Sequence, residues 1–565
     1  MENNFSDKEN SQDISSGSEV SANLRETQNF EDGDLTGNGE DFNDDALGEE
    51  GKKHGLKGAL TEDEKDASLE AKKYVSKKEL WMYGLAAGGQ GMIYAIMSSY
   101  ISEFYLNVAM LPPMFVFWLM LIARVLDTAY DPFIGAIMDK NELKGGKYKS
   151  YVLFTAIPIA VLTFLMFFVP KNISMKGLMA YSAVTYVLWG MVYSISDVPF
   201  WCLPNVITPN ASERGHLISF SRLLNGIGSA VPMAMYMLFS LILPFMTKKT
   251  GTELDKIQYM VIALFCAIVG GAIFITSHFT TKERVVLPKS PKKEKSEDSS
   301  FKRVMKCKPL MLVVLMGILA SGRYLVQVAA IHVARYSFYV GPSLEGLDAH
   351  AVDAALRASR GLVSTVFMVC SAAGMFGAML FLPKLYKKFN YKQIVIVSCL
   401  LGFASSILMA VLGWFVSFWA CVPFIIISAI PLGVINVTSY AMIGDALDYM
   451  EWETGKREPA LGSATQTFVN QFSNAIATSL IVLMYLALSI DPAGIIQESG
   501  IFNPLEMSKK IRFGMFSLVS ILPGVSMLLC TIPVFFYDIV GKKKNKIMKE
   551  LEEKRIEKGI TFEEE

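Results

Sequence analysis

The sequence has few charged residues and very few histidines. Of its 565 residues, 19% are Asp, Glu, Lys or Arg and five are His, whereas 52% are hydrophobic. This balance is too apolar for an ordinary water-soluble enzyme of several domains. The seven cysteines lie far apart and form no CxxC pair, which argues against a disulfide framework and against a zinc site. We interpret them as small buried hydrophobic residues.

Two further motifs are missing. The sequence has no GxxxxGK(S/T) phosphate-binding loop, so any transport would draw its energy from an ion gradient. Its acidic N-terminus lacks the basic and apolar regions of a cleavable signal peptide, and we expect the first membrane helix to direct insertion. We expect no organic cofactor and no nucleic-acid partner.

Long apolar segments dominate the rest of the chain. A bilayer core about 30 Å thick needs about 20 apolar residues in a helix. Twelve segments meet this need, which predicts an all-α membrane protein of twelve transmembrane helices with the lipid bilayer as its surroundings. The predicted spans are residues 79–106, 113–138, 150–170, 176–203, 217–246, 257–280, 309–340, 361–384, 391–413, 417–443, 460–489 and 511–539.

A basic connector between the sixth and seventh spans predicts two six-helix bundles, as in a paired-bundle transporter. The domains expected are an acidic disordered cytoplasmic tail, an N-terminal bundle, a basic linker, a C-terminal bundle and a charged cytoplasmic tail, at residues 1–75, 76–284, 285–308, 309–541 and 542–565 respectively. The first fifty residues hold 15 Asp and Glu against two Lys and Arg. This tail is either a dispensable extension or a regulatory segment that visits the basic loops.

Lys and Arg residues predict the orientation in the membrane. With both termini inside, the cytoplasmic connectors hold 21 Lys and Arg and the opposite connectors hold ten. This excess follows the positive-inside rule and predicts a multi-pass protein of the cell membrane with both termini in the cytoplasm, in a bacterial plasma membrane. The Lys542 to Lys546 cluster would then anchor the topology next to anionic lipid.

The second span carries the best candidates for a cation site. Arg124, Asp127 and Asp131 are spaced by three and four residues, which places them on one face of a helix. Because an ionised side chain inside a bilayer is costly, such residues are functional candidates. Two carboxylates with one guanidinium leave a net negative site that needs a proton or a metal ion such as Na⁺. The alternative is a structural ion-pair cluster that holds helices together.

The fourth span ends with an acid beside a proline and two aromatic residues, Asp197, Pro199, Phe200 and Trp201. A carboxylate next to a flat indole ring suits a sugar, whose faces are apolar and whose edges are polar. The alternative is a packed kink at the helix end. Arg222 in the fifth span has no acid near it in sequence, and we expect it to pair with a carboxylate of the second or fourth span.

Two further groups have a structural interpretation. Gly135, Asp139 and Lys140 close the second span beside a basic loop, which favours a gating role. The seventh span holds several polar residues, and we interpret His332 there as a satisfied histidine at the membrane interface.

Several motifs together resemble one transporter family. They are RVLDTAYDPFIG (124–135), GKYK (146–149), WGM (189–191), DVPFW (197–201) and DALDYME (445–451), with Arg222, Arg457 and Gln466. This set resembles the glycoside-pentoside-hexuronide:cation symporters of the major facilitator superfamily, whose familiar member is the melibiose permease. The resemblance spans most of the membrane region and excludes the acidic tail.

The resemblance implies a role for each matching residue. Asp127 and Asp131 would bind the coupling Na⁺ or H⁺, with Arg124 as their charge partner and Ser194 as a further oxygen ligand. Substrate would contact Tyr193, Asp197, Trp201, Arg222 and, by its position, Gln471. The halves would lock at the cytoplasmic side through Asp445, Asp448, Tyr449, Glu451 and Arg457.

The sequence departs from the family pattern at three positions. Gly91, preceded by Gln90, stands where melibiose-type members carry a sugar-binding aspartate. Gln471 replaces a lysine that helps to couple cation and sugar, and Tyr130 replaces an amide among the cation ligands. These departures leave open which substrate is carried and which cation drives it.

The residues and the resemblance together predict a secondary transporter, not an enzyme. Cation-coupled symport of a sugar or glycoside by alternating access is the leading prediction. The alternatives are a symporter for an amphiphilic lipid or organic anion, and a sensor with the same fold that does not transport. A membrane enzyme would need a nucleophile with its base or a His-rich metal site, and the intramembrane acids provide neither.

Overall fold

The computed structural model describes residues 73–140, 146, 148–208, 210–284, 306–455, 459–496 and 501–557. Within helices, the side chains of residues 125, 128–133, 135–140, 211, 212, 459–464, 496, 552 and 555–557 are outside this description. The predicted acidic tail lies almost entirely outside the described residues, and so does most of the predicted linker. All regular structure in the described ranges is helical.

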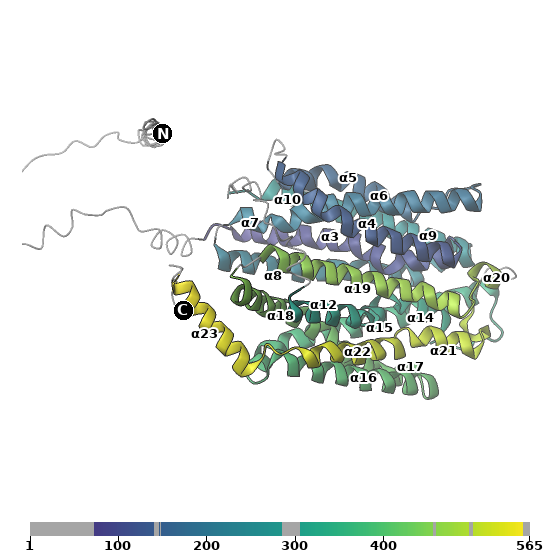
Figure 1. Ribbon diagram of the computed structural model, residues 1–565. Helices are drawn as coiled ribbons and strands as arrows, with labels where there is room; N and C mark the ends of the chain where they lie inside the picture. The colour runs from purple at the N-terminus through teal and green to yellow at the C-terminus, as the bar shows by residue number, and fades with distance from the viewer. Residues whose placement is uncertain are drawn as a thin grey trace, which may run out of the picture. The chain divides into compact units, whose positions relative to one another are not determined.

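The first half of the membrane region occupies the upper part of Figure 1, in purple and blue. Its elements are α3 (Lys77–Glu103), η2 (Phe104–Val108), α4 (Pro113–Lys140), α5 (Lys149–Met166), α6 (Met175–Cys202), α7 (Pro204–Ile207), α8 (Ala211–Met246), α9 (Gly251–Phe265), η3 (Cys266–Gly270) and α10 (Gly271–Thr280).

The second half follows in teal, green and yellow. Its elements are α12 (Lys308–Leu319), η4 (Ala320–Tyr324), α13 (Leu325–Val328), α14 (Ala330–Tyr336), α15 (Ala349–Tyr386), α16 (Tyr391–Phe415), α17 (Phe418–Ser428), α18 (Ile430–Thr454), α19 (Pro459–Ala487), α20 (Pro492–Ile496), η5 (Pro504–Glu506), α21 (Lys509–Ser517), α22 (Ile521–Phe536) and α23 (Gly541–Glu557).

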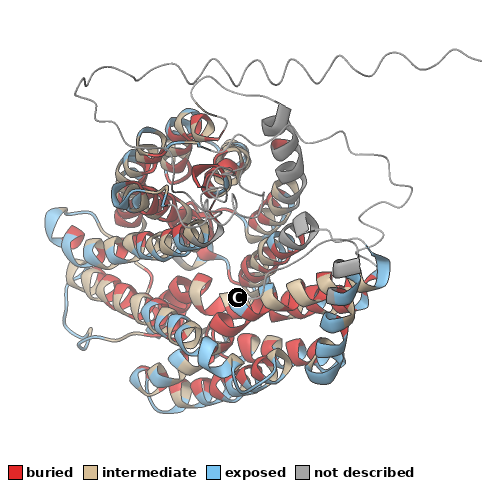
Figure 2. Cartoon of the chain, turned by 90° about the vertical axis from the view of Figure 1, so that its left-hand side faces the viewer, coloured by how far each residue is buried: buried red, intermediate tan, exposed pale blue. Residues whose placement is uncertain are grey.

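The helices confirm a multi-pass membrane protein. In the described ranges, ten helical stretches are long and apolar enough to cross a membrane. Helices α3 and α4 match the first two predicted spans, so every one of the twelve predicted spans falls on helix. Large apolar side chains point outward, among them Phe154, Leu380 and Phe415 at 65%, 78% and 78% exposure. Figure 2 shows buried residues inside the bundles and exposed ones at their rim, which is the pattern expected for lipid contact.

Polar side chains define where several helices begin and end. Ser76, Ser174 and Asp348 each accept a hydrogen bond from a backbone N–H of the first turn that follows them. Such capping satisfies groups that the helix itself leaves unpaired. At the other end of α18, Gly455 has a φ of 71°, the left-handed conformation that glycine adopts without strain.

Three predicted spans contain irregular helical turns. The π-helical segment η2 ends the first span, the π-helical segment η3 interrupts the sixth, and the 3₁₀ segment η4 interrupts the seventh. Such irregular turns leave the regular ladder of backbone hydrogen bonds and are frequent at functional sites. Segment η2 begins directly after Glu103, a buried carboxylate that belongs to the ion cluster described below.

Helices α3 and α8 are in backbone contact. A Cβ atom built on Gly228 would lie 2.0 Å from the carbonyl oxygen of Gly88, and one on Gly91 would lie 2.3 Å from the carbonyl oxygen of Asn225. A side chain at either position would therefore push the helices apart, as expected for small residues at membrane helix interfaces. This contact joins the first and fifth spans of the first half.

The two ends of the bundle are named here by the helices found there. Helix α23 lies at the left in Figure 1 and α20 at the right, and we call these the α23 end and the α20 end. Helix α3 runs from the α23 end at Lys77 to the α20 end at Glu103.

The structure corrects where the eighth span begins. Helix α15 starts at Ala349 rather than at residue 361, so Arg357 and Arg360 are helical and buried instead of lying in a connector. Asp348 caps this early start, and Asp353 pairs with Arg357 one turn later. Asp353 and Arg357, in the first turns of α15, made the segment resemble a connector in the sequence.

Most of the predicted charged tail at 542–565 is helix α23. Ile547 and Leu551 are 4% and 2% exposed, and α23 packs against the end of α18. Lys544, from the basic cluster, binds Asp445 with 2.8 Å between Nζ and Oδ2. This lysine therefore contacts the protein.

Candidate functional site

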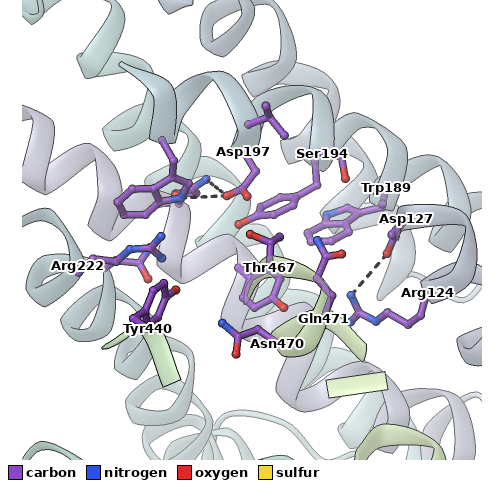
Figure 3. Close-up of a pocket in the computed structure, with 17 residues that line it drawn as sticks. Arg124, Asp127, Trp189, Ser194, Asp197, Arg222, Tyr440, Thr467, Asn470 and Gln471 are labelled. Atoms are coloured by element: carbon purple, nitrogen blue, oxygen red, sulfur yellow. Dashed lines mark hydrogen bonds and ion pairs between the residues drawn. The ribbon is translucent and has the colours of Figure 1, made fainter. Parts of the chain in front are cut away.

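A cavity of about 430 Å³ lies between the two halves of the membrane region. Helices α3, α4, α6 and α8 of the first half line it, together with α18 and α19 of the second half. Figure 3 shows its side chains converging from both halves. The lining residues are Gln90, Tyr94, Arg124, Asp127, Trp189, Gly190, Tyr193, Ser194, Asp197, Val198, Trp201, Arg222, Asn225, Tyr440, Thr467, Asn470 and Gln471.

The predicted cation-site residues that are described lie in this cavity. The Nη1 atom of Arg124 is 3.5 Å from Oδ2 of Asp127, one helical turn along α4. Ser194, on α6, lines the same cavity and is 9% exposed. Asp131 belongs to α4, but its side chain lies outside the described residues. The arrangement brings a carboxylate, a hydroxyl and a guanidinium to one wall.

Gly190 leaves room for Asp127. A Cβ atom on this α6 residue would lie 2.6 Å from Oδ1 of Asp127, which is too close for two non-bonded heavy atoms. The Asp127 carboxylate therefore occupies the space that a side chain at 190 would fill. The position of this carboxylate therefore depends on the absence of a side chain at residue 190 as well as on Arg124.

Asp197 is surrounded by neutral hydrogen-bond donors. Its Oδ1 accepts from Gln90 Nε2 at 2.7 Å and from Trp201 Nε1 at 3.1 Å. The first donor comes from α3, and the second lies one turn farther along α6. These bonds orient the carboxylate. Because both donors are neutral, neither of them supplies a positive charge to balance it.

Arg222 lies on the indole ring of Trp201. Its Cζ atom is 3.6 Å from the ring centroid, a cation–π contact of short range. The expected ion pair of Arg222 with a carboxylate is not found among the described residues, and its side chain is exposed to the cavity. The guanidinium therefore presents its N–H donors to whatever fills the cavity.

An aromatic stack forms another part of the wall. The rings of Trp189 and Tyr193 are parallel within 9°, with centroids 4.8 Å apart, and Tyr94 lies 5.3 Å from Tyr193. Trp189 Nε1 donates to Thr163 Oγ1 at 2.8 Å, which fixes the stack against α5. Flat apolar faces beside polar groups suit a ring with polar edges, such as a sugar.

The second half contributes uncharged polar groups. Gln471 lies on this wall as the sequence predicts, close to Asn470 and Thr467 of the same helix. Gln466 Nε2 donates to Ser439 Oγ at 3.1 Å and to Asn470 Oδ1 at 3.3 Å. All described charges that line the cavity thus come from the first half.

The register of the first span differs from the sequence expectation. Gly91 faces α8, where its missing side chain permits the backbone contact, and it does not line the cavity. Gln90 lines the cavity instead and binds Asp197. A neutral amide therefore occupies the place on α3 that faces Asp197.

The predicted locking residues lie at the α23 end. Asp445 binds Lys544 of α23, and Tyr449 lies 5.9 Å from the Lys543 ammonium group, measured to its ring centroid. Asp448 and Glu451 belong to the same helix, α18. Gly135, Asp139 and Lys140 belong to α4, but their side chains lie outside the described residues, as does all of Arg457. Their gating role stays a prediction.

A second polar cluster, at the α20 end, was missed by the sequence prediction. Five of its members join the two halves: Glu103 of α3, Asp255 of α9, and Arg335, Arg357 and Arg360 of α14 and α15. Each of these side chains is 5% exposed or less. We call these five residues, with Asp353 and His332, the ion cluster.

Asp255 is the centre of the ion cluster. Its carboxylate lies 3.1 Å from Arg335 Nη2, 2.5 Å from Arg357 Nη1 and 3.2 Å from Arg360 Nη1. Arg335 Nε also pairs with Glu103 Oε1, and Arg357 Nε pairs with Asp353 Oδ2 at 2.8 Å. Apart from the Arg357–Asp353 pair, which lies within α15, these contacts bind the first half to the second at the α20 end.

The signal for the ion cluster was present in the sequence. Glu103 is a carboxylate inside a predicted span, and Asp353 and Arg357 have the helical spacing of an ion pair. His332 is satisfied by hydrogen bonds, as the sequence predicts, and its side chain is fully buried between helices. Its expected position at the membrane interface stays a prediction.

Comparisons with known proteins agree with this architecture. A family model described as MFS/sugar transport protein matches residues 82–340 and 352–541. An uncharacterized symporter of Bacillus subtilis, YjmB, is 26% identical over 87% of this chain and 98% of its own. The isoprimeverose transporter of Lactiplantibacillus pentosus is 24% identical over 87% of this chain and 95% of its own.

Two more proteins are similar to this chain. The glucuronide carrier protein homolog of Escherichia coli is 22% identical over 84% of this chain and 95% of its own. The crystal structure of a bacterial homolog of the human lysosomal transporter Spinster, inward-facing and unoccupied, has a TM-score of 0.54 at 13% identity and covers 84% of this chain and 99% of its own. That likeness shows the fold.

The predicted fold class and the prediction of a transporter rather than an enzyme are confirmed. The family match covers both halves of the membrane region, and the motifs at 124–135 and 445–451 both fall within it. The chain belongs to the MFS/sugar transport protein family of secondary transporters.

Proposed function

We propose that this protein is a cation-coupled symporter that carries a sugar or glycoside with an anionic group into a bacterial cell. The observation that carries the proposal is that Arg124 and Asp127 share one cavity with Asp197, Trp201 and Arg222. A cation site and a sugar site in contact with the same cavity are what reciprocal coupling of their affinities requires.

The coupling cation would bind at Asp127, with Asp131 and Ser194 as further oxygen ligands. Carboxylate and hydroxyl oxygens suit a hard cation such as Na⁺, and a carboxylate also accepts a proton. Arg124 balances part of the negative charge and holds Asp127 against α6. No cofactor is needed, because the ion gradient supplies the energy.

The guanidinium of Arg222 favours an anionic substrate over a neutral one. It presents several N–H donors in a plane, which match the two oxygens of a carboxylate or the oxygens of a sulfonate. Asp197, bonded to Gln90 and Trp201, would accept sugar hydroxyl groups, and the rings of Trp189 and Tyr193 would cover an apolar sugar face. An organic anion without a sugar ring would use Arg222 but leave Asp197 and the rings unused.

The basic residues and α23 support one orientation in the membrane. We place the α23 end in the cytoplasm, in accordance with the positive-inside rule. The ion cluster then closes the outer side of the cavity, whereas the ion pairs Glu79–Arg284 and Asp445–Lys544 at the α23 end each lie within one half. This arrangement corresponds to an inward-facing state in an alternating-access cycle.

Uptake into vesicles tests the proposal. The purified protein is reconstituted, a Na⁺ or H⁺ gradient is imposed, and accumulation of labelled neutral glycosides, uronides and sulfonated sugars is measured. We expect gradient-driven accumulation of an anionic sugar that Asp127→Asn abolishes. Glu345→Gln, which changes an exposed loop carboxylate, is the matched control and should accumulate normally.

Two outcomes would contradict this proposal. Accumulation of neutral glycosides in preference to uronides and sulfonates would reject the anionic substrate class. Binding of sugar without flux under either gradient, in folded protein, would favour the sensor over the symporter.

A further inference from the structure

A second pocket lies at the α20 end, apart from the cavity described above. Its volume is about 420 Å³, within the usual range of small-molecule sites, about 300–1,000 Å³. Tyr485, which lines it, follows Gln471 of the other cavity by 14 residues, about 21 Å along α19. We call this second space the rim pocket. Its lining residues are Met110, Leu111, Pro112, Pro113, Met175, Tyr485, Leu486, Ser489, Ile490, Asp491 and Ala493.

The two walls of the rim pocket belong to different halves. Residues 110–113, between η2 and α4, and Met175, at the start of α6, come from the first half. The remaining lining residues come from the end of α19 and from α20, in the second half. Asn107 Nδ2 of η2 donates to the Tyr485 hydroxyl at 2.8 Å, which ties one wall to the other. The pocket is therefore complete only while the halves are together at this end.

Both walls contain a turn of the same kind. Met110 and Ser489 have φ angles of 55° and 51°, in the left-handed region that non-glycine residues rarely adopt. A proline with a fixed φ follows each of them, Pro112 after two residues and Pro492 after three. Residues held in such conformations are frequent at ligand clamps. The two turns give the rim pocket defined walls before any ligand binds.

The lining of the rim pocket is apolar with one charge at its edge. Methionine, leucine, isoleucine and proline side chains supply most of the surface, and Asp491 is the one charged residue among the lining residues. Asp491 Oδ1 accepts the Ala493 N–H at 3.2 Å, and in the described part of the chain no Lys or Arg pairs with this carboxylate. An apolar molecule with a positive group matches this lining. The anionic sugar proposed for the other cavity does not.

We propose that the rim pocket is a binding site for a compact amphiphilic amine, whose apolar body fills the pocket and whose ammonium group lies beside Asp491. Because the walls come from both halves, the amine contacts both of them only while the α20 end is closed. Binding therefore shifts the protein towards its closed form at this end. The site stands on the pocket alone, and only its consequence, inhibition of uptake, rests on the proposed function.

Asp491 contributes selectivity more than affinity. Its side chain is exposed, and an ion pair at an exposed position strengthens binding by up to about fivefold. An amine should therefore bind about threefold to fivefold more tightly than a neutral molecule of the same shape, and an anion of that shape should bind more weakly than both. The apolar body supplies the rest of the affinity through burial between the two walls.

Calorimetric titration of the full-length protein in detergent tests the site. The probes are adamantan-1-amine, adamantan-1-ol and adamantane-1-carboxylate, which share one rigid apolar cage and are cationic, neutral and anionic at pH 7. The heat of adding each probe to protein-free micelles is subtracted. We expect the affinity to fall from the amine to the alcohol to the carboxylate. The absence of amine binding, or equal affinities for the three probes, would overturn the proposal.

Two variants locate the site. Asp491→Asn keeps an oxygen for the Ala493 N–H but removes the charge, so the preference for the amine over the alcohol should disappear. Glu345→Gln, at an exposed loop carboxylate, is the control and should keep it. Ala493→Phe adds a ring to the lining and should weaken binding of all three probes, and Met175→Trp, on the opposite wall, replaces it if it fails to fold. Unchanged binding in folded Asp491→Asn or in the folded pocket-filling variant contradicts the proposal.

Distance measurements test the preference for the closed form. Spin labels are attached at Lys249→Cys and Ser343→Cys, in exposed loops of opposite halves, after Cys202 and Cys370 are replaced by alanine. Asp255→Asn is added to weaken the ion cluster. At an amine concentration about tenfold above its Kd, we expect the ratio of closed to open forms to rise about tenfold. An unchanged ratio in protein that binds the amine would show that the site does not select the closed form.

These measurements need neither substrate nor gradient. Failure of gradient-driven uptake in vesicles would leave the binding of the amine and the label distances unaffected. Conversely, a protein that does not bind the amine would still accumulate sugar if the proposed function is right.

Discussion

The Arg222 guanidinium lies 3.6 Å from the centroid of the Trp201 indole ring, on helices that meet at the cavity between the two halves. The same indole donates its N–H to Asp197, so one ring supports a cation on its face and a carboxylate at its edge. These contacts arrange positive and negative groups side by side without an ion pair between Arg222 and Asp197 among the described residues. A bound molecule with an anionic group and hydroxyl groups would complement both.

Substitution of Arg222 tests this arrangement. Arg222→Lys keeps the charge but loses the planar pair of N–H donors, so we expect the affinity for an anionic sugar to fall about tenfold, or about 1.4 kcal/mol. The affinity for a neutral sugar should change little. Calorimetric titration of the purified protein with a uronide and with its neutral analogue measures both. Equal losses of affinity for the two ligands would show that Arg222 does not recognise the anionic group.

Gly190 provides a test of the Asp127 site. Gly190→Ala would place a Cβ atom 2.6 Å from Asp127 Oδ1, so the carboxylate must move away from its position beside Arg124. We expect at least about a tenfold loss of cation-stimulated uptake, since about 1.4 kcal/mol of lost cation binding suffices for it. Gly377→Ala, at a helical glycine with open space around it, is the control and should transport normally. Normal coupling in Gly190→Ala would show that Asp127 tolerates displacement.

The ion cluster makes a clear prediction about stability. Asp255→Asn leaves Arg335, Arg357 and Arg360 without their shared carboxylate, and loss of one partner from a buried charge cluster costs about 3–5 kcal/mol. We expect a lower melting temperature and a larger fraction with the α20 end open. Glu253→Gln, two residues earlier on the same helix, breaks an exposed pair with Lys256 and should cost at most about 1 kcal/mol. Equal melting temperatures for both variants would contradict the central role of Asp255.

Helix α23 is expected to detach when its buried face is made polar. Leu551→Asp places a charge where the side chain is 2% exposed against the rest of the protein. We expect faster cleavage by trypsin after the lysines of α23, measured by mass spectrometry. Met548→Asp, which is 39% exposed on the same helix, should leave the cleavage rate unchanged. Similar rates in the two variants would show that α23 is not held by this face.

Much of the fold was predictable because a membrane helix can be recognised from its own segment of the sequence. Each of the twelve predicted spans is an apolar run of sufficient length, and each lies on helix in the structure. The cavity residues Arg124, Asp127, Asp197 and Trp201 were also found, since charged and aromatic groups stand out within apolar segments. These predictions rested on the local pattern of apolar and polar residues and on helical spacing.

The contacts between distant segments were not predictable in the same way. Glu103 and Arg335 are 232 residues apart, and nothing in either segment identifies the other as its partner. The position of Arg222 on Trp201, instead of in an ion pair, depends on how α6 and α8 are packed. Gln90, rather than Gly91, lies at the cavity wall. The difference corresponds to a rotation of α3 by one residue, and the sequence alone does not determine that rotation.

The backbone contact between α3 and α8 has a mechanical consequence. Because Gly88 and Gly228 bring the two backbones into direct contact, α3 and α8 pack closely together, and we expect them to move as one body. Helix α3 continues without interruption from Gln90 to Glu103, a lever arm of about 20 Å. A tilt of about 10° at the cavity would carry the far end by about 3 Å over that length, which exceeds the tolerance of a hydrogen bond. A small movement of α3 around a bound molecule would thus displace Glu103 far enough to break its contacts in the ion cluster.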